Sequence, residues 1–322
     1  MHYINQQDIE SIDYSWHDCV DVIEQAIHCL QDQEFAQPIK PYLRYKDPVN
    51  RIIAMPAYIG GKFQKAGIKW IASFPGNIDQ GIPRAHSVVI LNDSDTGQPQ
   101  AVINTPMLST IRTAAVTGLF IRRHQDARPR KGLRLAILGW GPIGKTHFDM
   151  CREILKGQIE SVQLYDIRPI DRSTIPEVPF PVKVADSWEE AYQHADVFMT
   201  CTVADKPYID KAPKPGSLHL NVSLRDYTTD TYDYFKDAMF VDDWDEVCRE
   251  ATDVENLHIE KGLQREDTYN LDDLIHTDVL QQLPAETPVL FNPMGMAIFD
   301  IAVGTYFLDR VKTEQVGTLL AS

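Results

Sequence analysis

The stretch from Leu133 to His147, LRLAILGWGPIGKTH, decides the fold class of the C-terminal half of the chain. Its apolar start predicts a buried strand. The Gly139-x-Gly141-x-x-Gly144 turn that follows predicts a dinucleotide-binding site at the start of a helix. Gly139 allows the tight turn, Gly141 lets the backbone approach a pyrophosphate, and Gly144 lets the helix pack closely on the strand.

The predicted cofactor site extends to residues that follow this turn. Pro142 and Ile143 begin the helix, where free backbone N–H groups bind phosphate oxygens. Asp166 ends the next apolar run, 22 residues after Gly144 and close to the ~20 at which an acid binds the adenosine ribose. Its carboxylate would repel a 2′-phosphate, so Asp166 favours NAD over NADP. Arg168, which we also place at the cofactor, weakens that preference.

The same run also matches the phosphate loop of NTPases. It continues into Lys145-Thr146, which completes a G-x-x-x-x-G-K-T pattern, and the segment AMFVDD (Ala238 to Asp243) would supply a magnesium-binding acid. An NTPase needs neither the additional glycine at Gly141 nor an acid at Asp166, so these two residues favour the dinucleotide. The phosphate loop stays as the alternative.

The pattern of apolar runs along the chain predicts an α/β protein of two domains. From residue 133 onward, apolar strands alternate with helices, which is typical of a Rossmann-type dinucleotide-binding domain with a parallel sheet; we place it at residues 126–295. Before it, short apolar runs from Arg51 to Thr105 predict antiparallel strands, and Met107 to His124 predicts a helix. Residues 1–125, joined by a C-terminal helix in 296–322, form an α+β substrate-binding and dimerisation domain.

Composition argues against several classes of partner and site. Among 322 residues, 31 Lys and Arg stand against 46 Asp and Glu, a net charge of -15, which disfavours nucleic acid and an anionic membrane. Five widely spaced cysteines without a CxxC pair predict neither disulfides nor a zinc ribbon and fit a reducing cytoplasm. The acids Asp8 and Glu10 argue against a signal peptide. The histidines lack ligand spacing, so we expect no metal site.

Several basic residues of the first domain lie among apolar neighbours. Strand alternation places Lys69 on the face opposite Ile68 and Trp70, and Arg112 lies on a helix that is apolar around much of its circumference. A buried cation needs an anionic partner, and a ligand carboxylate would serve. Internal ion pairs or a solvated face are the alternatives.

Motifs spread over nearly the whole chain resemble the ornithine cyclodeaminase/mu-crystallin family. They are MPAYIGG (Met55 to Gly61), GIKWI around Lys69, DSDTG followed by PQAV, SxxRTAA (Ser109 to Ala115), GWGPIG, and NVSLRD (Asn221 to Asp226). KPYLR (Lys40 to Arg44) and FNPMGMAIFDI (Phe291 to Ile301) are similar to one branch of that family. That branch consists of N-(2-amino-2-carboxyethyl)-L-glutamate dehydrogenases, which release 2,3-diaminopropionate for siderophores such as staphyloferrin B.

The resemblance implies roles for residues in both domains. It implies that Arg44, Lys69 and Arg112 hold the α-carboxylate of the substrate, with Lys69 at the catalytic centre. It also implies that Asp226 is the catalytic acid/base opposite the nicotinamide. The residues implied to line the cofactor site are Thr113, Thr202, Val222, Ser223, Met294 and Gly295.

Two departures from the family pattern bear on the substrate. Ornithine cyclodeaminases carry a glutamate where this chain has Ile53, which argues against ornithine cyclisation. Arg84 and His86 stand at expected pocket positions that relatives usually give to small or uncharged residues. Their additional cationic capacity suits a substrate with several carboxylates.

We therefore expect an NAD-dependent dehydrogenase of N-(2-amino-2-carboxyethyl)-L-glutamate that works as a homodimer. Two alternatives stay open. One is another chemistry of the family, namely ornithine cyclodeamination, ketimine reduction or an alanine dehydrogenase-like reaction. The other is a non-enzymatic nicotinamide-binding protein of the mu-crystallin type. The presence of both Lys69 and Asp226 argues against this last function.

Overall fold

A computed structural model describes residues 1–321 of the chain. The chain divides into two compact units, residues 1–115 with 295–322 and residues 116–294. The division falls inside the long helix α3 (Met107–Ala127), whereas the sequence placed the boundary near residue 125, after the helix. The C-terminal helix belongs to the first unit.

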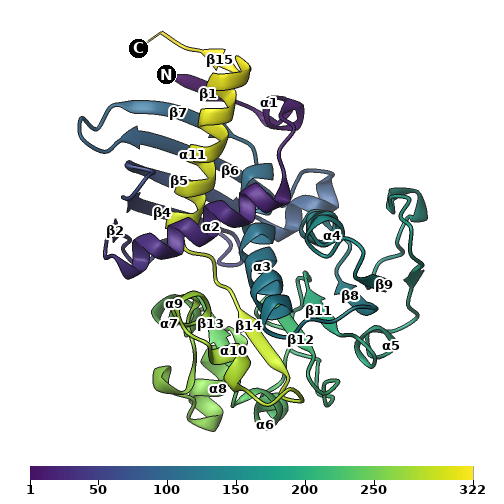
Figure 1. Cartoon of the computed structure of the whole chain (residues 1–322). Coiled ribbons are helices and arrows are strands. Elements are labelled where there is room, and N and C mark those ends of the chain that lie inside the picture. Colours follow the sequence, from purple (N-terminus) through teal and green to yellow (C-terminus); the bar gives the residue numbers. More distant parts are fainter. Residues whose placement is uncertain (322) are drawn as a thin grey trace. The chain divides into compact units, whose positions relative to one another are not determined.

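The first unit contains an eight-stranded mixed sheet (Figure 1). The order along it is β15-β1-β7-β6-β5-β4-β2, and β3 pairs with β4 off this path. Its strands are β1 (His2–Ile4), β2 (Phe35–Ala36), β3 (Tyr42–Arg44), β4 (Arg51–Ile59), β5 (Lys65–Ser73), β6 (Ala85–Asp93), β7 (Pro99–Asn104) and β15 (Thr318–Leu319). The run β4 to β7 is antiparallel, as the sequence predicts, and β1 joins β7 in parallel.

Two helices, α2 (Trp16–Gln31) and α11 (Ala297–Glu314), pack together on one face of this sheet (Figure 1). A Cβ at Gly67 of β5 would lie 2.8 Å from Ile301 Cδ1, so the glycine allows α11 to approach the strand closely. Short elements complete the unit: α1 (Gln6–Ser11) and a 3-10 helix at Pro75–Gln80. The face beneath α11 is therefore the buried face, and it carries Lys69.

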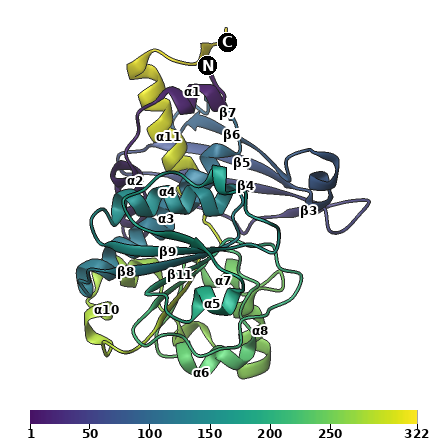
Figure 2. The same ribbon diagram turned by 90° about the vertical axis from the view of Figure 1, so that its right-hand side faces the viewer.

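The second unit is a seven-stranded parallel sheet (Figure 2). Its order is β10-β9-β8-β11-β12-β14-β13, with a switch between β8 and β11. The strands are β8 (Leu133–Leu138), β9 (Ile159–Tyr165), β10 (Val182–Val184), β11 (Val197–Thr200), β12 (Leu218–Asn221), β13 (Met239–Val241) and β14 (Val289–Asn292). The first five strands of the unit follow the Rossmann order, with the first beside the fourth, and β14 lies between β12 and β13. Ligands bind at the carboxyl ends of the strands at the switch.

Helices cover both faces of the parallel sheet (Figure 2). On one side, Phe120 of α3 stacks on Phe291 of β14, with ring centroids 4.6 Å apart, and α4 (Pro142–Ile154) lies against β8. On the other side, α5 (Trp188–Tyr192), α6 (Tyr232–Phe235) and α8 (Asp253–Lys261) contribute to one buried apolar cluster. The remaining helices are α7 (Trp244–Val247), α9 (Leu271–His276), α10 (Val279–Gln282) and 3-10 turns at Arg172–Thr174, Thr229–Thr231 and Arg265–Asp267.

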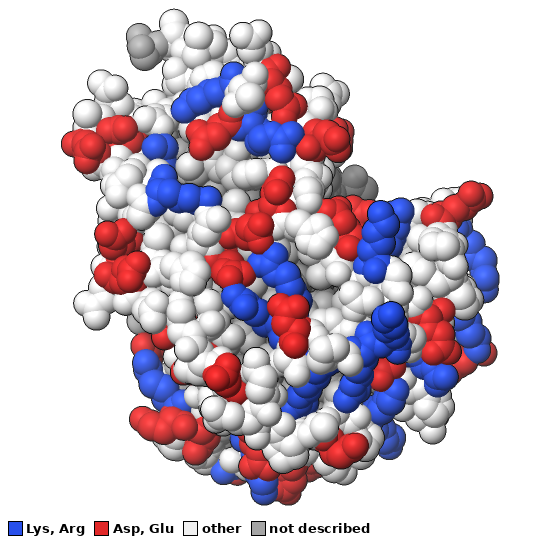
Figure 3. Space-filling model, viewed as in Figure 1, with Lys and Arg blue, Asp and Glu red and all other residues white. Residues whose placement is uncertain are grey.

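On the visible surface, basic side chains lie among acidic ones (Figure 3). No helix within residues 1–321 is long and apolar enough to cross a membrane. The same residues contain no group of three or more His, Cys, Asp or Glu side chains arranged to hold a metal ion. All five cysteines are free thiols.

Candidate active site

A buried charge cluster lies between the sheet and the helices of the first unit. Lys69, in the centre of β5, donates from Nζ to Asp300 Oδ1 at 2.9 Å and to Ser109 Oγ at 2.9 Å. Arg112 on α3 donates from Nε to the same Asp300 oxygen at 3.0 Å. Asp300 lies in the first turn of α11, where the helix dipole stabilises a negative charge. The cluster thus brings together three charged side chains that are far apart in sequence, one each from β5, α3 and α11.

This cluster has capacity for a further anion. Two cationic side chains share the single carboxylate of Asp300, so the three side chains carry a net positive charge when Lys69 is protonated. Burial lowers the pKa of Lys69 to about 7, and the attraction of Asp300 opposes this shift. A ligand carboxylate would supply the missing negative charge and favour the protonated form of Lys69.

Lys40 and Gly295 border the cluster. Lys40 is only 3% exposed, and its Nζ donates to the carbonyl oxygen of Gly295 at 2.8 Å. Gly295 has a φ of +87°, and a Cβ there would lie 2.4 Å from Arg112 Nη1. Only glycine therefore allows this close approach to the guanidinium. Of the two cations in KPYLR, Arg44 is the predicted ligand, whereas Lys40 is the one that borders the cluster.

Three predicted substrate-binding residues lie apart from Lys69. Arg44, at the exposed end of β3, lies on the same face of the sheet as Lys69. It pairs with Arg51 of β4, whereas Lys69 pairs with Met55, four residues further along that strand. Arg44 Nη1 donates to Pro48 O at 2.8 Å.

Arg84 precedes β6, and its carbonyl accepts the Phe74 N–H at 2.9 Å. His86 pairs with Ala72 on β5 and is exposed on the face opposite Lys69, because side chains alternate along a strand. The structure therefore gathers Lys69 and Arg112 at one point, and it does not bring Arg44, Arg84 or His86 to their cluster.

Asp226 lies in the second unit, in the loop after β12 at the carboxyl end of the parallel sheet. It is fully buried. Its Oδ1 accepts from Thr202 Oγ1 at 2.5 Å, and its Oδ2 accepts from Ser223 Oγ. Burial raises the pKa of Asp226, and hydrogen bonds from the hydroxyls of Thr202 and Tyr208 oppose this effect. A carboxyl with a raised pKa at this edge of the sheet is suited to proton transfer.

The glycine turn between β8 and α4 has the geometry that a pyrophosphate needs. Gly139 has a φ of +93°, and a Cβ there would lie 2.4 Å from Cys201 O. A Cβ at Gly144 would lie 1.9 Å from Gly139 O. At Gly141, in contrast, a Cβ would meet nothing within 4 Å, so this glycine leaves open space at the N-terminus of α4. Pro142 and Ile143 form the first turn of this helix. These residues fit a dinucleotide.

Asp166 follows β9 and is tied to the glycine turn. Its Oδ2 accepts the Trp140 N–H at 2.8 Å, and its Oδ1 accepts the Arg168 N–H at 2.9 Å. The Arg168 side chain is exposed, with Nε 3.6 Å from the same oxygen. The carboxylate is therefore held beside the turn, where the family fingerprint requires it for the ribose.

The remaining predicted cofactor residues lie at strand ends or on α3. Thr113 donates from Oγ1 to Ser109 O at 2.8 Å, and the Met294 N–H donates to Asp242 Oδ1 at 2.9 Å. Thr202 follows β11, and Val222 and Ser223 follow β12. For the phosphate-loop alternative, Lys145 is exposed and Thr146 Oγ1 donates to Pro142 O at 2.9 Å within α4.

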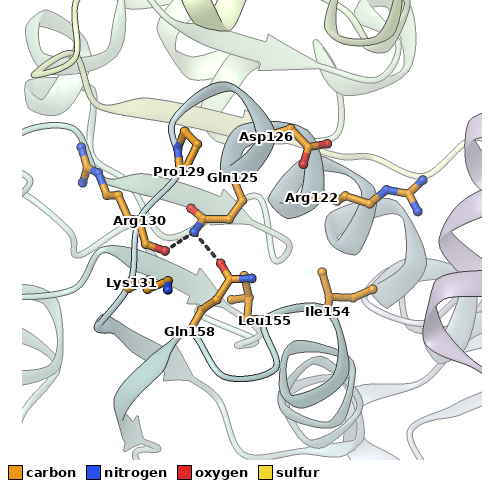
Figure 4. A pocket seen from close by; sticks show the side chains of 9 residues that line it. All are labelled: Arg122, Gln125, Asp126, Pro129, Arg130, Lys131, Ile154, Leu155 and Gln158. Carbon is orange, nitrogen blue, oxygen red and sulfur yellow. Dashed lines mark hydrogen bonds between the residues drawn. The ribbon is translucent and has the colours of Figure 1, made fainter.

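A cavity of about 570 Å³ lies elsewhere, at the amino ends of β8 and β9 (Figure 4). Gln125 and Gln158 face one another there, with Nε2 and Oε1 2.6 Å apart. None of the predicted site residues lines this cavity. The predicted site residues therefore lie outside this cavity.

Comparison with known proteins decides the family. The model of the ornithine cyclodeaminase/mu-crystallin family matches residues 2–315. The chain belongs to this family. One relative, the N-((2S)-2-amino-2-carboxyethyl)-L-glutamate dehydrogenase of Staphylococcus aureus (strain NCTC 8325 / PS 47), is 34% identical over 338 aligned residues, which cover 99% of this chain and 98% of the relative.

Solved structures of the same size share the fold. Delta(1)-pyrroline-2-carboxylate reductase of Thermococcus litoralis, in complex with NADH and L-proline, superimposes with a TM-score of 0.88 at 21% identity, covering 99% of this chain and 100% of the other. An archaeal alanine dehydrogenase dimer with bound NAD gives a TM-score of 0.81 at 22% identity, covering 99% and 98%. The predicted Rossmann fold and family are thus confirmed, and the phosphate-loop alternative is set aside.

Proposed function

We propose that this protein oxidises the secondary amine of N-(2-amino-2-carboxyethyl)-L-glutamate with NAD and hydrolyses the product to 2-oxoglutarate and L-2,3-diaminopropionate. The protein is an NAD-dependent dehydrogenase that acts on an amino acid. One observation carries the substrate class: Lys69 and Arg112 converge, both buried, on one oxygen of Asp300 and leave capacity for a ligand carboxylate. The particular substrate is supported by the 34% identical relative, which is an N-((2S)-2-amino-2-carboxyethyl)-L-glutamate dehydrogenase. The 2,3-diaminopropionate released by this reaction would serve siderophore biosynthesis.

The chain's own residues would bind the substrate and move its protons. Lys69 and Arg112 bind the α-carboxylate of the glutamyl part, which fixes its α-carbon. Asp226 accepts the proton of the secondary amine. Bound NAD would supply the acceptor for a hydride from that α-carbon, and loss of this hydride would leave a C=N bond. Water then adds to this carbon with the help of Asp226, and cleavage of the C–N bond releases a ketone and a primary amine.

The reaction is tested directly with purified protein, NAD and the proposed substrate. We expect NADH, 2-oxoglutarate and 2,3-diaminopropionate in equal amounts, by absorbance and mass spectrometry. Asp226→Asn removes the titratable group at nearly constant size, so turnover should fall by ~10²–10⁴ while NAD affinity stays the same. Turnover of L-alanine, L-ornithine or L-proline in place of this substrate would contradict the proposal and favour another chemistry of the family. Wild-type turnover by Asp226→Asn would show that the proton moves elsewhere.

Ornithine is the less suitable substrate on the geometry of β4. Ile53, where cyclodeaminases carry a glutamate, pairs with Ile71 on the face of the sheet that carries Lys69. The position is apolar, so it offers no charge for a second amino group.

We also propose that the protein works as a homodimer in the cytoplasm. A solved relative is an alanine dehydrogenase dimer, and the face of β4 to β7 opposite Lys69 carries partly exposed apolar side chains. Free thiols suit a reducing compartment.

A further inference from the structure

A second buried carboxyl supports the loop that carries Asp226. Asp253 is the first residue of α8 and only 2% exposed. Its Oδ2 accepts three hydrogen bonds: from Asn221 Nδ2 at 2.9 Å, from the Asp226 N–H at 3.0 Å and from the Tyr227 N–H at 3.0 Å. Its Oδ1 is also buried and has no hydrogen-bond partner within residues 1–321. One carboxylate oxygen of Asp253 thus holds the backbone N–H groups of both Asp226 and Tyr227.

The loop needs this support because its backbone is strained. Leu224 has a φ of +65°, a left-handed conformation that non-glycine residues rarely adopt. The Leu224 N–H donates to Asn221 Oδ1 at 3.1 Å, and the Leu224 carbonyl accepts the Asp253 N–H at 2.8 Å. Asp253 is therefore bonded to the loop through both its backbone and its side chain.

Asn221 extends the support to the strands. Besides Asp253, its Nδ2 donates to Asn292 Oδ1 at 2.8 Å at the end of β14. Its Oδ1 accepts from Thr200 Oγ1 at 3.0 Å at the end of β11. Three strand ends are thus connected with α8 through buried side chains, and a network of this kind favours a single loop conformation.

We propose that Asp253 is a positioning residue, whose carboxylate fixes the Asp226–Tyr227 backbone so that the Asp226 carboxyl is held in the orientation that proton transfer requires. The inference rests on the proposed role of Asp226 as acid/base. Burial raises the pKa of Asp253 to about 6, and the N–H donors of Tyr227 and Asn221 oppose this shift. The carboxylate is therefore the main form at neutral pH, and a charged acceptor holds N–H donors more strongly than a neutral one.

Two substitutions separate the parts of this role. Asp253→Leu has a similar size but accepts no hydrogen bond, so three donors lose their partner. Asp253→Asn keeps one acceptor oxygen without the charge. A small displacement of a reacting group costs up to about 10²-fold in rate. We expect kcat to fall by about that factor in Asp253→Leu and by less in Asp253→Asn, with NAD affinity and substrate KM within about twofold of wild type.

Asp196→Asn is the matched control. Asp196 is 9% exposed, accepts the backbone N–H of Arg134 at 3.0 Å and pairs with Lys214 Nζ at 2.6 Å. It precedes β11, at the amino edge of the sheet, away from Asp226. It therefore reproduces the loss of a buried carboxylate in the same unit. We expect lower thermal stability and unchanged kcat per NAD-binding molecule.

Amide hydrogen exchange tests the anchor without turnover. In both Asp253 variants the Asp226 and Tyr227 amides should exchange faster than in wild type, most in Asp253→Leu, and Asp196→Asn should leave them unchanged. Unaltered exchange at these two amides, an unchanged kcat in Asp253→Leu, or an equal loss of kcat in Asp196→Asn would each overturn the inference. A wild-type protein that oxidises no amino acid would instead refute the proposed function, and the exchange data would still decide whether Asp253 fixes the loop.

Discussion

Lys69 carries a full positive charge only below neutral pH, because burial lowers its pKa to about 7. Binding of a carboxylate needs the protonated form, so kcat/KM should fall as the pH rises through about 7. Asp226 must be ionised to accept a proton, and burial raises its pKa. The rate should therefore rise with pH at the acid end and fall at the alkaline end.

Lys69→Arg tests the assignment of the alkaline side, since a guanidinium stays charged throughout this range. The profile of kcat/KM against pH should lose its fall near neutrality in Lys69→Arg, even if its overall level drops, and the rise at the acid end should stay. A fall at the same pH in both proteins would mean that another group, such as the substrate amine, titrates there.

At the residue scale, sequence reasoning found the cations and missed their partner. Lys69 and Arg112 were recognisable because they interrupt apolar patterns. Asp300 also interrupts an apolar helix, but it lies 231 residues from Lys69, and only the return of α11 to the sheet brings them together. Lys40 follows no periodic pattern at all. Pairing of distant charges depends on topology, which local patterns do not contain.

The glycine turn between β8 and α4, where we propose that NAD binds, allows two effects of glycine to be distinguished. A methyl group at Gly144 would lie 1.9 Å from Gly139 O, so Gly144→Ala should distort the turn and lower the melting temperature as well as abolish NAD binding. At Gly141 a methyl group meets no protein atom within 4 Å. Gly141→Ala should therefore keep wild-type stability and lose NAD affinity, because its methyl group occupies the space of the pyrophosphate.

Thermal melting and NAD titration of both variants check this prediction. Wild-type NAD affinity in Gly141→Ala would show that the pyrophosphate does not approach this residue. An equal loss of stability in the two variants would show that Gly141, like Gly144, is needed for the packing of the turn itself.

Periodicity predicted the elements that bury an apolar face. The strand β8 and the helix α3 both lie where the sequence places them. It missed β1, β2 and β15, which have two or three residues each. Such short segments show no alternation, and their pairing depends on the fold, which places β1 between β7 and β15 and β2 beside β4.

At the scale of the whole molecule, an apolar surface on the sheet of the first unit is partly exposed in the single chain. Its residues lie on the face of β4 to β7 opposite Lys69: Ala54, Pro56, Ile68, Trp70, Val88, Ile90 and Val102. They are partly exposed, and Trp70, in the middle of the sheet, is 42% exposed. A contiguous apolar patch of this kind on an acidic protein is typical of an interface, and a second copy can cover it with its own identical face.

Trp70→Glu should therefore disrupt the assembly, because a carboxylate at the centre of a closed apolar interface loses its hydration without gaining a partner. Ile167→Glu is the control, since Ile167 is 87% exposed and lies in the other unit. By sedimentation velocity at low micromolar concentration, wild type and Ile167→Glu should have about twice the chain mass of 36.6 kDa, and Trp70→Glu should approach the chain mass itself. A monomeric wild type would refute the dimer. A dimeric Trp70→Glu would place the interface on another surface, because the like charges of two facing sheets could not be accommodated here.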